Sequence, residues 1–357
     1  MPYLNITEVE SAVTSLATAF PGASDLIELP EPSVEGRACH ALRIGTVPAG
    51  TNDCVVLIGG VHAREWGSCE ILVDIAADLL EAYAAGTGLV YGGTGFTADD
   101  VRKILRELDL VVFPLVNPDG RRYSQTVEPM WRKNRNPAQS GGDPERIGVD
   151  INRNYDFLFD FETAFDPAAA PRVSSDPGDL VYQGPRPFSE PETRNVRWLL
   201  DSCPRTRWFI DVHSYSEALL TVWGDDENQS GEPSQNFLNP AYDHQRGRGA
   251  DAYGEYFAKS DADDSMVLAR QFCAALHGVR GRTYRPMSGY HLYPTCGTSD
   301  DYAHARHIVD ERKGKILGFT VEWGDTAGGF HPPWAEMERI ILDVDAGLVR
   351  FCLTALT

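Results

Sequence analysis

The sequence predicts an α/β fold, in which a mostly parallel or mixed β-sheet is flanked by crossover helices. Short apolar runs, each long enough for one strand, alternate along the chain with longer segments of helical periodicity. The chain has 357 residues, 42% hydrophobic and 24% charged, which is the composition of a globular protein with a sizeable core. No apolar stretch reaches the roughly 18 residues of a transmembrane helix, so we expect none.

The expected strands and helices follow from these runs in chain order. The best strand candidates are His40 to Gly45, Val55 to Gly60, Asp109 to Val116, Trp208 to Val212, Leu219 to Trp223 and Leu317 to Glu322. The candidate helices are Gly67 to Ala85, Glu190 to Ser202, Ser265 to Leu276 and Pro333 to Leu353. Ser189 and Glu192 stand at the spacing of a capping box around Pro191, which predicts the start of the second helix.

Two stretches show neither a strand pattern nor a helical pattern, and they bear on the domain organisation. They are Phe165 to Pro187 and Gly224 to Asp264. The second is long, polar and rich in Gly, Asp and Asn, and strand patterns resume beyond it. We therefore expect a single domain over residues 1–357 with a surface excursion at about 224–264. The oligomeric state stays open.

Charge, cysteine content and the N-terminus limit the expected partners and compartment. The formal net charge of −20 argues against nucleic acid or an anionic membrane as a partner, because both would be repelled. Seven cysteines without a CxxC pair favour buried free thiols. The first residues, MPYLNITEVESAV, show no signal peptide, which predicts a cytoplasmic protein. Secretion is the alternative if a signal and a pro-segment were removed.

A candidate metal site follows the apolar run that ends at Gly60. His62 and Glu65, three residues apart, come directly after this strand, and His213 ends another apolar strand in WFIDVHSYS. Ligands at strand ends converge, because neighbouring parallel strands point their ends into one cleft. Two histidines and one glutamate leave one position open for water, as catalytic zinc requires. A structural role for His213 is the alternative. We expect one Zn²⁺ per chain.

Six different short motifs follow one another along the chain. They are His62-Ala63-Arg64-Glu65, Asn117-Pro118-Asp119-Gly120, Trp131-Arg132-Lys133-Asn134-Arg135, Asp150-Ile151-Asn152-Arg153-Asn154, His213-Ser214-Tyr215 and Val321-Glu322-Trp323. Together they resemble the zinc carboxypeptidase family (carboxypeptidase A/B, M14) from about Tyr3 to the C-terminus. The resemblance implies a three-layer α/β/α sandwich with a mixed, mainly eight-stranded twisted sheet. It also implies a metallocarboxypeptidase that hydrolyses the C-terminal bond of peptides, with peptide or protein C-termini as partners.

Two residues match the family's groups for the chemical step. Glu322 matches the catalytic carboxylate, and a carboxylate at a strand end can take a proton from water and pass it to the leaving amine. Arg132 matches the arginine that stabilises the oxyanion, a task for a fixed cation in a dry site. Both residues also have a non-functional interpretation. If the chain had no metal site, we would interpret Glu322 as a surface acid at a strand end and the WRKNR segment as a solvated loop.

Five residues match the family's substrate-binding groups. Asn152 and Arg153 match the pair that grips the terminal carboxylate, and a planar guanidinium suits that task because it bonds both oxygens. Tyr293 matches the mobile tyrosine that caps the bound residue. Arg64 and Tyr215 match residues that line the cleft.

Asp300 matches the base of the family's specificity pocket. Members with Asp there resemble carboxypeptidase B and prefer Lys or Arg, since a buried carboxylate needs a cationic partner. We therefore expect release of C-terminal Arg or Lys. Asp301, Thr295 and Thr298 leave the shape of the pocket open. The alternative role for Asp300 is to cap the helix that follows.

Two other functions compete with this reading. One is an N-acyl amino-acid deacylase or peptidoglycan amide hydrolase on a related zinc scaffold. The other is a zinc-holding module without catalysis. We also expect no pro-segment, in contrast to many secreted members of the family. Val222 stands before Trp223 where pancreatic-type members tend to have proline, so the resemblance does not carry a cis peptide over to this bond.

Overall fold

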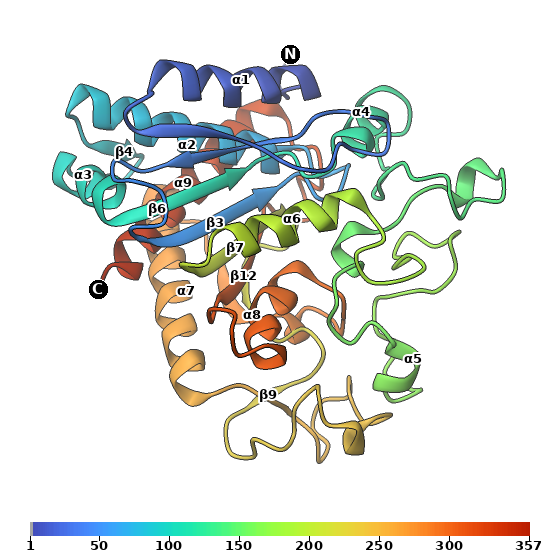
Figure 1. Ribbon diagram of the computed structural model, residues 1–357. Coiled ribbons are helices and arrows are strands. Elements are labelled where there is room, and N and C mark those ends of the chain that lie inside the picture. The colour runs from blue at the N-terminus through green and yellow to red at the C-terminus, as the bar shows by residue number, and fades with distance from the viewer. Residues whose placement is uncertain (1–2) are drawn as a thin grey trace.

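An eight-stranded mixed sheet forms the centre of the molecule, as the computed structural model of residues 3–357 shows (Figure 1). In spatial order its strands are β1 (Ser24–Glu28), β2 (His40–Ile44), β6 (Leu108–Phe113), β3 (Asp53–Gly59), β7 (Thr206–Ser214), β12 (Leu317–Trp323), β8 (Ala218–Thr221) and β11 (Arg285–Ser288). The four strands β6, β3, β7 and β12 are parallel. Their carboxyl ends therefore meet at one edge of the sheet.

Helices cover both faces of this sheet, which confirms the three-layer α/β/α fold. One face packs against α1 (Ile6–Ala19), α2 (Gly67–Ala85), α3 (Ala98–Glu107), α7 (Lys259–Arg280) and α9 (Trp334–Ala355). The other face packs against α6 (Pro191–Ser202) and α8 (Ser299–Val309). The remaining elements are α4 (Pro118–Thr126), α5 (Phe161–Ala164), β4 (Leu89–Tyr91), β5 (Thr94–Phe96), β9 (Asn228–Gln229) and β10 (Glu255–Tyr256).

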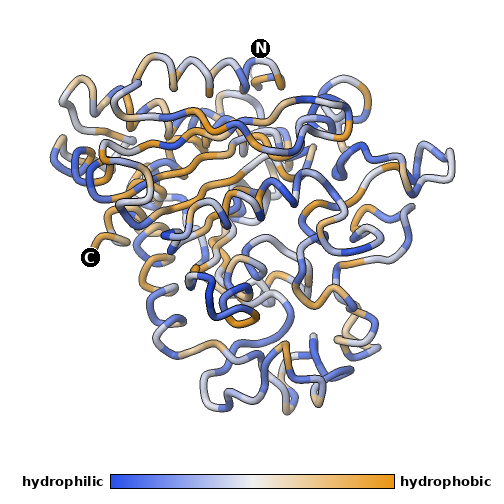
Figure 2. The backbone as a smooth tube through the Cα atoms, viewed as in Figure 1, coloured by the Kyte–Doolittle hydropathy of each residue, from blue (hydrophilic) through white to orange (hydrophobic). Residues whose placement is uncertain are grey.

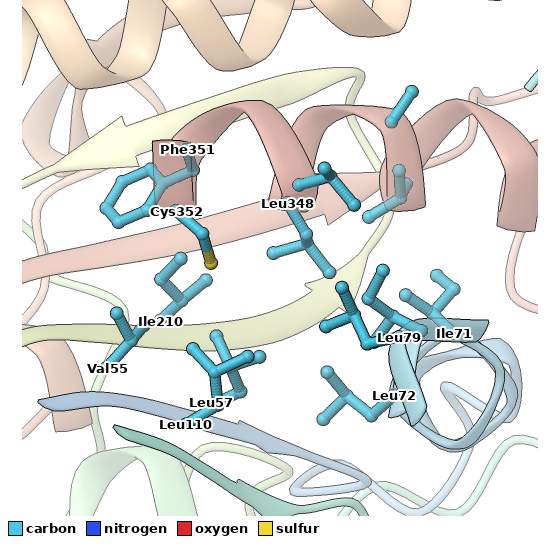
Figure 3. Packing of buried hydrophobic residues seen from close by; sticks show 14 of the residues in the cluster. Val55, Leu57, Ile71, Leu72, Leu79, Leu110, Ile210, Leu348, Phe351 and Cys352 are labelled. Carbon is cyan, nitrogen blue, oxygen red and sulfur yellow. The ribbon is translucent and has the colours of Figure 1, made fainter. Parts of the chain in front are cut away.

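The larger apolar core lies between the sheet and helices α2 and α9 (Figure 3). Leu72, Ile75 and Leu79 recur at spacings of three and four residues, so they share one face of α2 and are buried. Burying each such side chain contributes about 1.5–3 kcal/mol, before the entropy of ordering it is subtracted. Figure 2 shows the central strands coloured hydrophobic over most of their length.

All ten predicted strands and helices are present, and the largest boundary error is at α7. This helix begins at Lys259, whereas apolar periodicity predicted Ser265. Its first turn is polar and is held by ion pairs that periodicity does not detect, from Lys259 to Asp263 and from Lys315 to Asp261. The excursion therefore ends earlier than predicted.

The predicted capping box at the start of α6 is wrong. The N-cap is Glu190 and makes no side-chain capping bond, although Pro191 does occupy the first turn. The Ser189 hydroxyl donates to Glu190 Oε1 (2.7 Å) and accepts from Asn154 Nδ2 (2.9 Å). Ser189 is thus used by a tertiary partner, which the local spacing could not reveal.

Three further features of the described residues bear on the sequence-based expectations. All seven cysteines are free thiols, six of them buried. No helix combines the length and apolar character that crossing a membrane requires. The Val222–Trp223 and Ser214–Tyr215 peptide bonds are both cis. The resemblance alone left the first of these open.

A buried polar network joins α6 to the loop that precedes the site. Asn134 Nδ2 donates to Glu190 Oε2 (2.7 Å) and to Glu192 Oε2 (3.1 Å). Burial, and then the neighbouring Glu190 charge, raises the pKa of Glu192 from 4.5 to about 8. The folded protein therefore favours the protonated form of this carboxyl between those two pH values.

Replacing this carboxyl tests the network through the pH dependence of stability. Because the folded-state pKa is raised, the contribution of Glu192 is fully present below about pH 4.5 and is lost as pH rises through about 8. Glu192→Gln cannot ionise, so from pH 5 to 8.5 its unfolding free energy should fall less than that of wild type, by about 4 kcal/mol. Chemical denaturation at both pH values measures this. Exposed Glu107→Gln should behave as wild type, and an unchanged slope in Glu192→Gln would contradict the assignment.

Candidate active site

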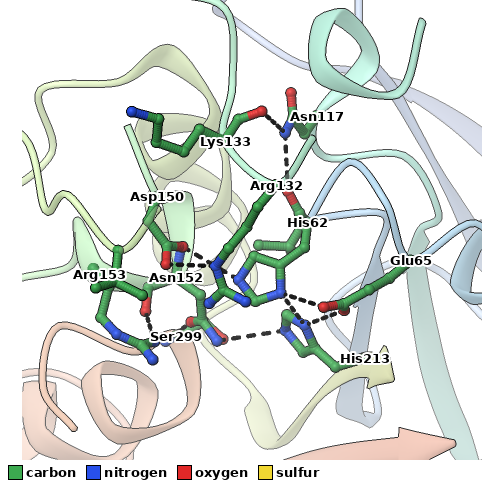
Figure 4. Close-up of polar contacts among 12 residues, drawn as sticks. His62, Glu65, Asn117, Arg132, Lys133, Asp150, Asn152, Arg153, His213 and Ser299 are labelled. Atoms are coloured by element: carbon green, nitrogen blue, oxygen red, sulfur yellow. Dashed lines mark hydrogen bonds and ion pairs between the residues drawn. The ribbon is translucent and has the colours of Figure 1, made fainter. Parts of the chain in front are cut away.

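Three parallel strand ends bring the predicted chemical groups to one edge of the sheet. His62 and Glu65 follow β3, His213 is the penultimate residue of β7, and Glu322 is the penultimate residue of β12. His213 and Glu322 lie directly opposite each other in the β7–β12 register. Figure 4 shows His62, Glu65 and His213 pointing toward one another.

A glycine turn carries the chain from β3 to the first two of these residues. Gly60 has a φ of +62°, and a Cβ there would lie 2.7 Å from Cys69 Sγ and 3.0 Å from the Pro114 carbonyl oxygen. Only glycine tolerates both the backbone conformation and this close approach. The Glu65 N–H then donates to the His62 carbonyl (3.1 Å), a turn that directs both side chains to one side.

The side chains of His62, Glu65 and His213 present a ligand set for one metal ion. Nδ1 of His62 lies 2.8 Å from Glu65 Oε1, Nδ1 of His213 lies 2.9 Å from Glu65 Oε2, and the two Nδ1 atoms are 3.0 Å apart. Tetrahedral zinc with bonds of about 2.0–2.2 Å separates its ligand atoms by about 3.4 Å, so shifts of a few tenths of an ångström suffice. The structure confirms the predicted metal site.

Two buried aspartates orient the histidine rings from behind. Asp150 Oδ1 lies 3.2 Å from His62 Nε2, and Asp211 Oδ2 lies 2.9 Å from His213 Nε2. These contacts keep the ring proton on Nε2 and leave each Nδ1 lone pair for the metal. Neither aspartate was given a role from the sequence. Asp211 could have been found, because a residue two positions before His213 on a strand faces the same side.

The same contacts set the competition between proton and metal at His213. Burial lowers the pKa of His213, but Asp211 and Glu65 raise it by more, so without a metal it lies well above its ordinary value. A metal ion must displace this proton, because only the neutral imidazole is a ligand. Metal affinity should therefore fall as pH falls.

Glu322 has a carboxyl suited to exchanging protons near neutral pH. Its side chain is 9% exposed, and burial, followed by the Glu65 charge, raises its pKa to about 8, while His213 and Arg132 oppose this shift. A metal cation nearby would lower that pKa. Such a group can accept a proton in one step and return it in the next.

Arg132 is held beside the metal ligands by Asp150. Its Nε donates to Asp150 Oδ2 (2.8 Å; Figure 4). Its carbonyl oxygen accepts from the Ala63 N–H (3.0 Å), which ties this loop to the ligand turn. Burial lowers the pKa of Arg132, but Asp150 and then Tyr293 raise it above its ordinary value. The guanidinium is therefore a fixed cation in a buried site.

Asn152 and Arg153 lie on a single 3-10 turn, Ile151–Arg153, between the ligands and α8. Asn152 Nδ2 is 3.4 Å from His213 Nε2, and its Oδ1 accepts from the Ser299 N–H (2.8 Å). The Arg153 guanidinium donates to the carbonyl oxygens of Arg172 and Asn152. A Cβ at Gly297 would lie 2.4 Å from the Arg153 carbonyl oxygen, so only glycine lets the segment before α8 pack this closely.

Tyr293, the predicted cap, and Arg64 and Tyr215, predicted to line the cleft, are partly exposed. Tyr293 is near enough to Arg132 to raise the pKa of the Arg132 guanidinium. Arg64 lies over the Phe330 ring (4.2 Å), and Tyr215 packs edge-on against the same ring (4.8 Å). Phe330 was missed by the sequence analysis, because it lies in the loop between β12 and α9 and belongs to no motif.

Asp300 lies deeper, on the α8 side of the sheet. It is 6% exposed and is the second residue of α8, whose N-cap is Thr298, so the capping alternative is wrong. Its Oδ2 accepts from Thr320 Oγ1 (2.9 Å), and Thr320 precedes Glu322 by two residues and so shares its face of β12. Burial raises the pKa of Asp300.

The family model for zinc carboxypeptidases matches residues 9–344. A carboxypeptidase B of Astacus astacus is 29% identical over 335 residues, which are 93% of this chain and 89% of that protein. A carboxypeptidase A2 of Rattus norvegicus is 30% identical over 239 residues, 65% of this chain and 51% of that protein. An inactive metallocarboxypeptidase of Talaromyces stipitatus is 28% identical over 215 residues, 57% of this chain and 32% of that protein.

The fold has close counterparts among solved structures. The crystal structure of thrombin-activatable fibrinolysis inhibitor superposes with a TM-score of 0.74 at 21% identity, over 98% of this chain and 73% of that one. At this identity the likeness shows the fold alone.

Removing the Asp211 carboxylate tests whether it positions His213 for the metal. Asp211→Asn should weaken zinc binding about 10- to 100-fold, because the amide no longer fixes the Nε2 proton. Competition with a chromophoric chelator at constant pH measures the affinity.

Ser299→Ala is the matched control for that variant. It removes the hydroxyl that donates to Asp211 Oδ2 (2.6 Å) but leaves the carboxylate beside His213, so zinc affinity should stay close to wild type. Equal losses in both variants would mean that Asp211 acts only through packing.

Proposed function

The chain belongs to the zinc carboxypeptidase family, and from this premise we propose that it removes single residues from peptide C-termini, with one Zn²⁺ at His62, Glu65 and His213. The observation on which the proposal rests is the convergence of these three ligands beside Glu322, at the meeting point of three parallel strand ends. The substrate class, the residue roles and the specificity below are parts of this proposal.

Glu322 is the proposed proton carrier of the reaction. A zinc ion held by the triad would polarise the scissile carbonyl and acidify a bound water. Glu322, opposite His213 in register, would take the proton of the attacking water and deliver it to the leaving amine. Its burial supports this role, since a carboxyl held away from bulk water keeps the proton it has accepted for the second transfer.

Arg132 is the proposed electrostatic partner of the transition state. Negative charge develops on the carbonyl oxygen as water attacks, and a preorganised cation in a water-poor site stabilises it. The bond from Arg132 Nε to Asp150 holds the guanidinium in place and leaves its terminal nitrogens for this oxygen.

Asn152 and Arg153 are proposed to bind the free terminal carboxylate, which an exopeptidase must recognise. A guanidinium and a side-chain amide both donate to carboxylate oxygens. Their turn is anchored to the start of α8 through Asn152 and Ser299, so the distance from the carboxylate to the metal would be fixed. Tyr293 would cover the bound residue, and Arg64 and Tyr215 would line the approach.

Asp300 is proposed to select C-terminal Arg or Lys. A carboxylate this buried, on the same face of the sheet as Glu322, has only neutral groups as hydrogen-bond partners in the described chain. A cationic substrate side chain would supply the missing charge. Relatives named carboxypeptidase B and carboxypeptidase A2 match at similar identity, so the preference rests on this residue.

Release of C-terminal residues from a peptide panel tests the reaction. The panel ends in Arg, Lys, Phe, Leu, Glu or a C-terminal amide, and mass spectrometry follows the products. Zinc-loaded wild type should trim free C-termini and spare the amide. Glu322→Gln should keep its zinc but lose about 10²- to 10⁴-fold in kcat, because proton transfer is removed.

Three results would contradict the reaction. Hydrolysis of N-acyl amino acids or peptidoglycan fragments in place of peptides would favour the amidase reading. No hydrolysis at all would place the chain with the inactive relatives. Full activity of Glu322→Gln would assign the proton transfer to another group.

Asp300→Asn tests the specificity separately from the reaction. Loss of a buried charge partner should lower kcat/KM for Arg and Lys ends about 10- to 100-fold and leave Phe ends unaffected. Asp301→Asn is the matched control, since the Asp301 carboxylate already accepts from the Gly224 N–H and from Thr298 Oγ1. Equal losses for Arg and Phe ends would mean general disruption and would contradict the specificity claim.

A further inference from the structure

A second cluster of metal-ligating side chains lies away from the zinc site, between α2 and α9. One carboxylate oxygen each of Asp74, Asp78 and Asp345 lies within 4.8 Å of the other two. Asp74 and Asp78 are four residues apart and therefore share one face of α2, while Asp345 comes from α9. Figure 3 shows these two helices side by side over the same sheet face.

Asp345 is the most deeply buried member of the cluster. Its side chain is 0% exposed, and among the described residues neither oxygen has a hydrogen-bond donor other than the Asp74 carboxyl, which can donate only when one of the two groups is protonated. A buried ionised carboxylate without partners is strongly disfavoured. Either a proton or a cation must therefore compensate this group in the folded protein.

No lysine or arginine of the described chain is among the main groups that shift the pKa of Asp345. Burial, followed by the Asp74 charge, a hydrogen bond to Asp74 and the Asp78 charge, raises its pKa well above the ordinary value, so its influential neighbours are themselves acids. Asp343, two residues earlier on α9, differs in this respect because it forms an ion pair with Arg280 (2.7 Å). Arg280 thus neutralises Asp343, whereas Asp345 has no such cationic partner within residues 3–357.

Tyr91 holds one face of the cluster in place. Its hydroxyl donates to Asp78 Oδ2 (2.7 Å), and the tyrosine is 2% exposed and packs edge-on against Phe96. This bond orients the Asp78 carboxylate and leaves its other oxygen free to bind. The position of the cluster therefore depends on three elements of the fold.

We propose that Asp74, Asp78 and Asp345 bind a hard divalent cation, with Ca²⁺ as the best match, which ties α2 to α9. The ligands are all carboxylate oxygens, which suit Ca²⁺ or Mg²⁺, whereas zinc prefers nitrogen and sulfur. Oxygens bound to one Ca²⁺ ion at about 2.4 Å stand at most about 4.8 Å apart, so the three groups come within reach of one ion with side-chain shifts of a few tenths of an ångström. Water would complete the shell, because Asp74 and Asp78 are only partly buried.

A cation at this cluster would stabilise, indirectly, the edge of the sheet that carries the metal ligands and Glu322. Helix α2 begins at Gly67, two residues after Glu65, and Asp74 lies about 10 Å further along its axis. An ion at the cluster would fix this helix against α9 without touching the metal ligands. We therefore expect it to contribute to stability, with no requirement for it in the peptidase reaction.

The experiment uses the full chain loaded with one equivalent of zinc and freed of other divalent ions on a chelating resin. Thermal unfolding is then followed as CaCl₂ is added at constant ionic strength, with MgCl₂ as a second arm. Equilibrium dialysis with ⁴⁵Ca²⁺ counts the bound ions. Wild type should gain several degrees in Tm in a saturable manner and bind one Ca²⁺ per chain, because a ligand that binds only the folded state stabilises it.

Asp345→Asn separates cation binding from a change in folding. The amide is isosteric and can donate to Asp74, so the variant should fold, yet its Tm should no longer respond to Ca²⁺. Glu81→Gln removes one exposed negative charge from the same helix and should keep the full shift. His62→Ala should keep it too, which distinguishes this site from the catalytic centre whether or not the peptidase proposal holds.

Two outcomes would overturn the proposal. One is a wild-type Tm that responds to neither Ca²⁺ nor Mg²⁺, in which case a proton shared between Asp345 and Asp74 balances the cluster. The other is an undiminished Ca²⁺ shift in Asp345→Asn, which would place the bound ion elsewhere.

Discussion

The buried carboxylate of Asp150 holds the catalytic edge of this protein together. One oxygen lies 3.2 Å from His62 Nε2 and accepts the Asn152 N–H (3.0 Å), and the other accepts from Arg132 Nε (2.8 Å). Burial alone would raise the pKa of Asp150, but Arg132 and His62 lower it well below its ordinary value, so it stays ionised. A single charge therefore orients a metal ligand, the proposed oxyanion partner and the turn that carries Arg153.

Strand periodicity explains how a buried core and a polar site share one sheet. On β7 the alternate residues Ile210 and Val212 join the larger core, while Asp211 and His213 face the other way. The side of β7 that carries Asp211 and His213 also contributes Phe209 to the core beneath α6 and α8. One face of the strand thus changes from apolar to functional as it approaches its carboxyl end, where a parallel sheet has room for a site.

The excursion shows a different way of ordering a chain. Arg246 is 0% exposed and donates to the carbonyl oxygens of four residues, at distances of 3.2–3.3 Å: Ala164, Tyr242, Asn236 and Asn239. Nearby, the Tyr253 hydroxyl donates to Glu255 (2.6 Å), which is also fully buried. A buried guanidinium satisfies many carbonyl groups at once, so a polar segment with little regular structure can still pack.

The sequence by itself determined ten of the strands and helices in chain order, because apolar spacing records which face of each of these elements is buried. It also determined the three metal ligands, since two of them share one short local motif, and it placed Glu322 near the end of a strand. Only the tertiary structure decided the contacts between distant residues: Ser299 against Asp211, Phe330 beneath Arg64, and the Ser189 hydroxyl turned toward Asn154. Such pairs leave no periodic trace, because each partner belongs to a different element and they meet only once both have packed against the sheet.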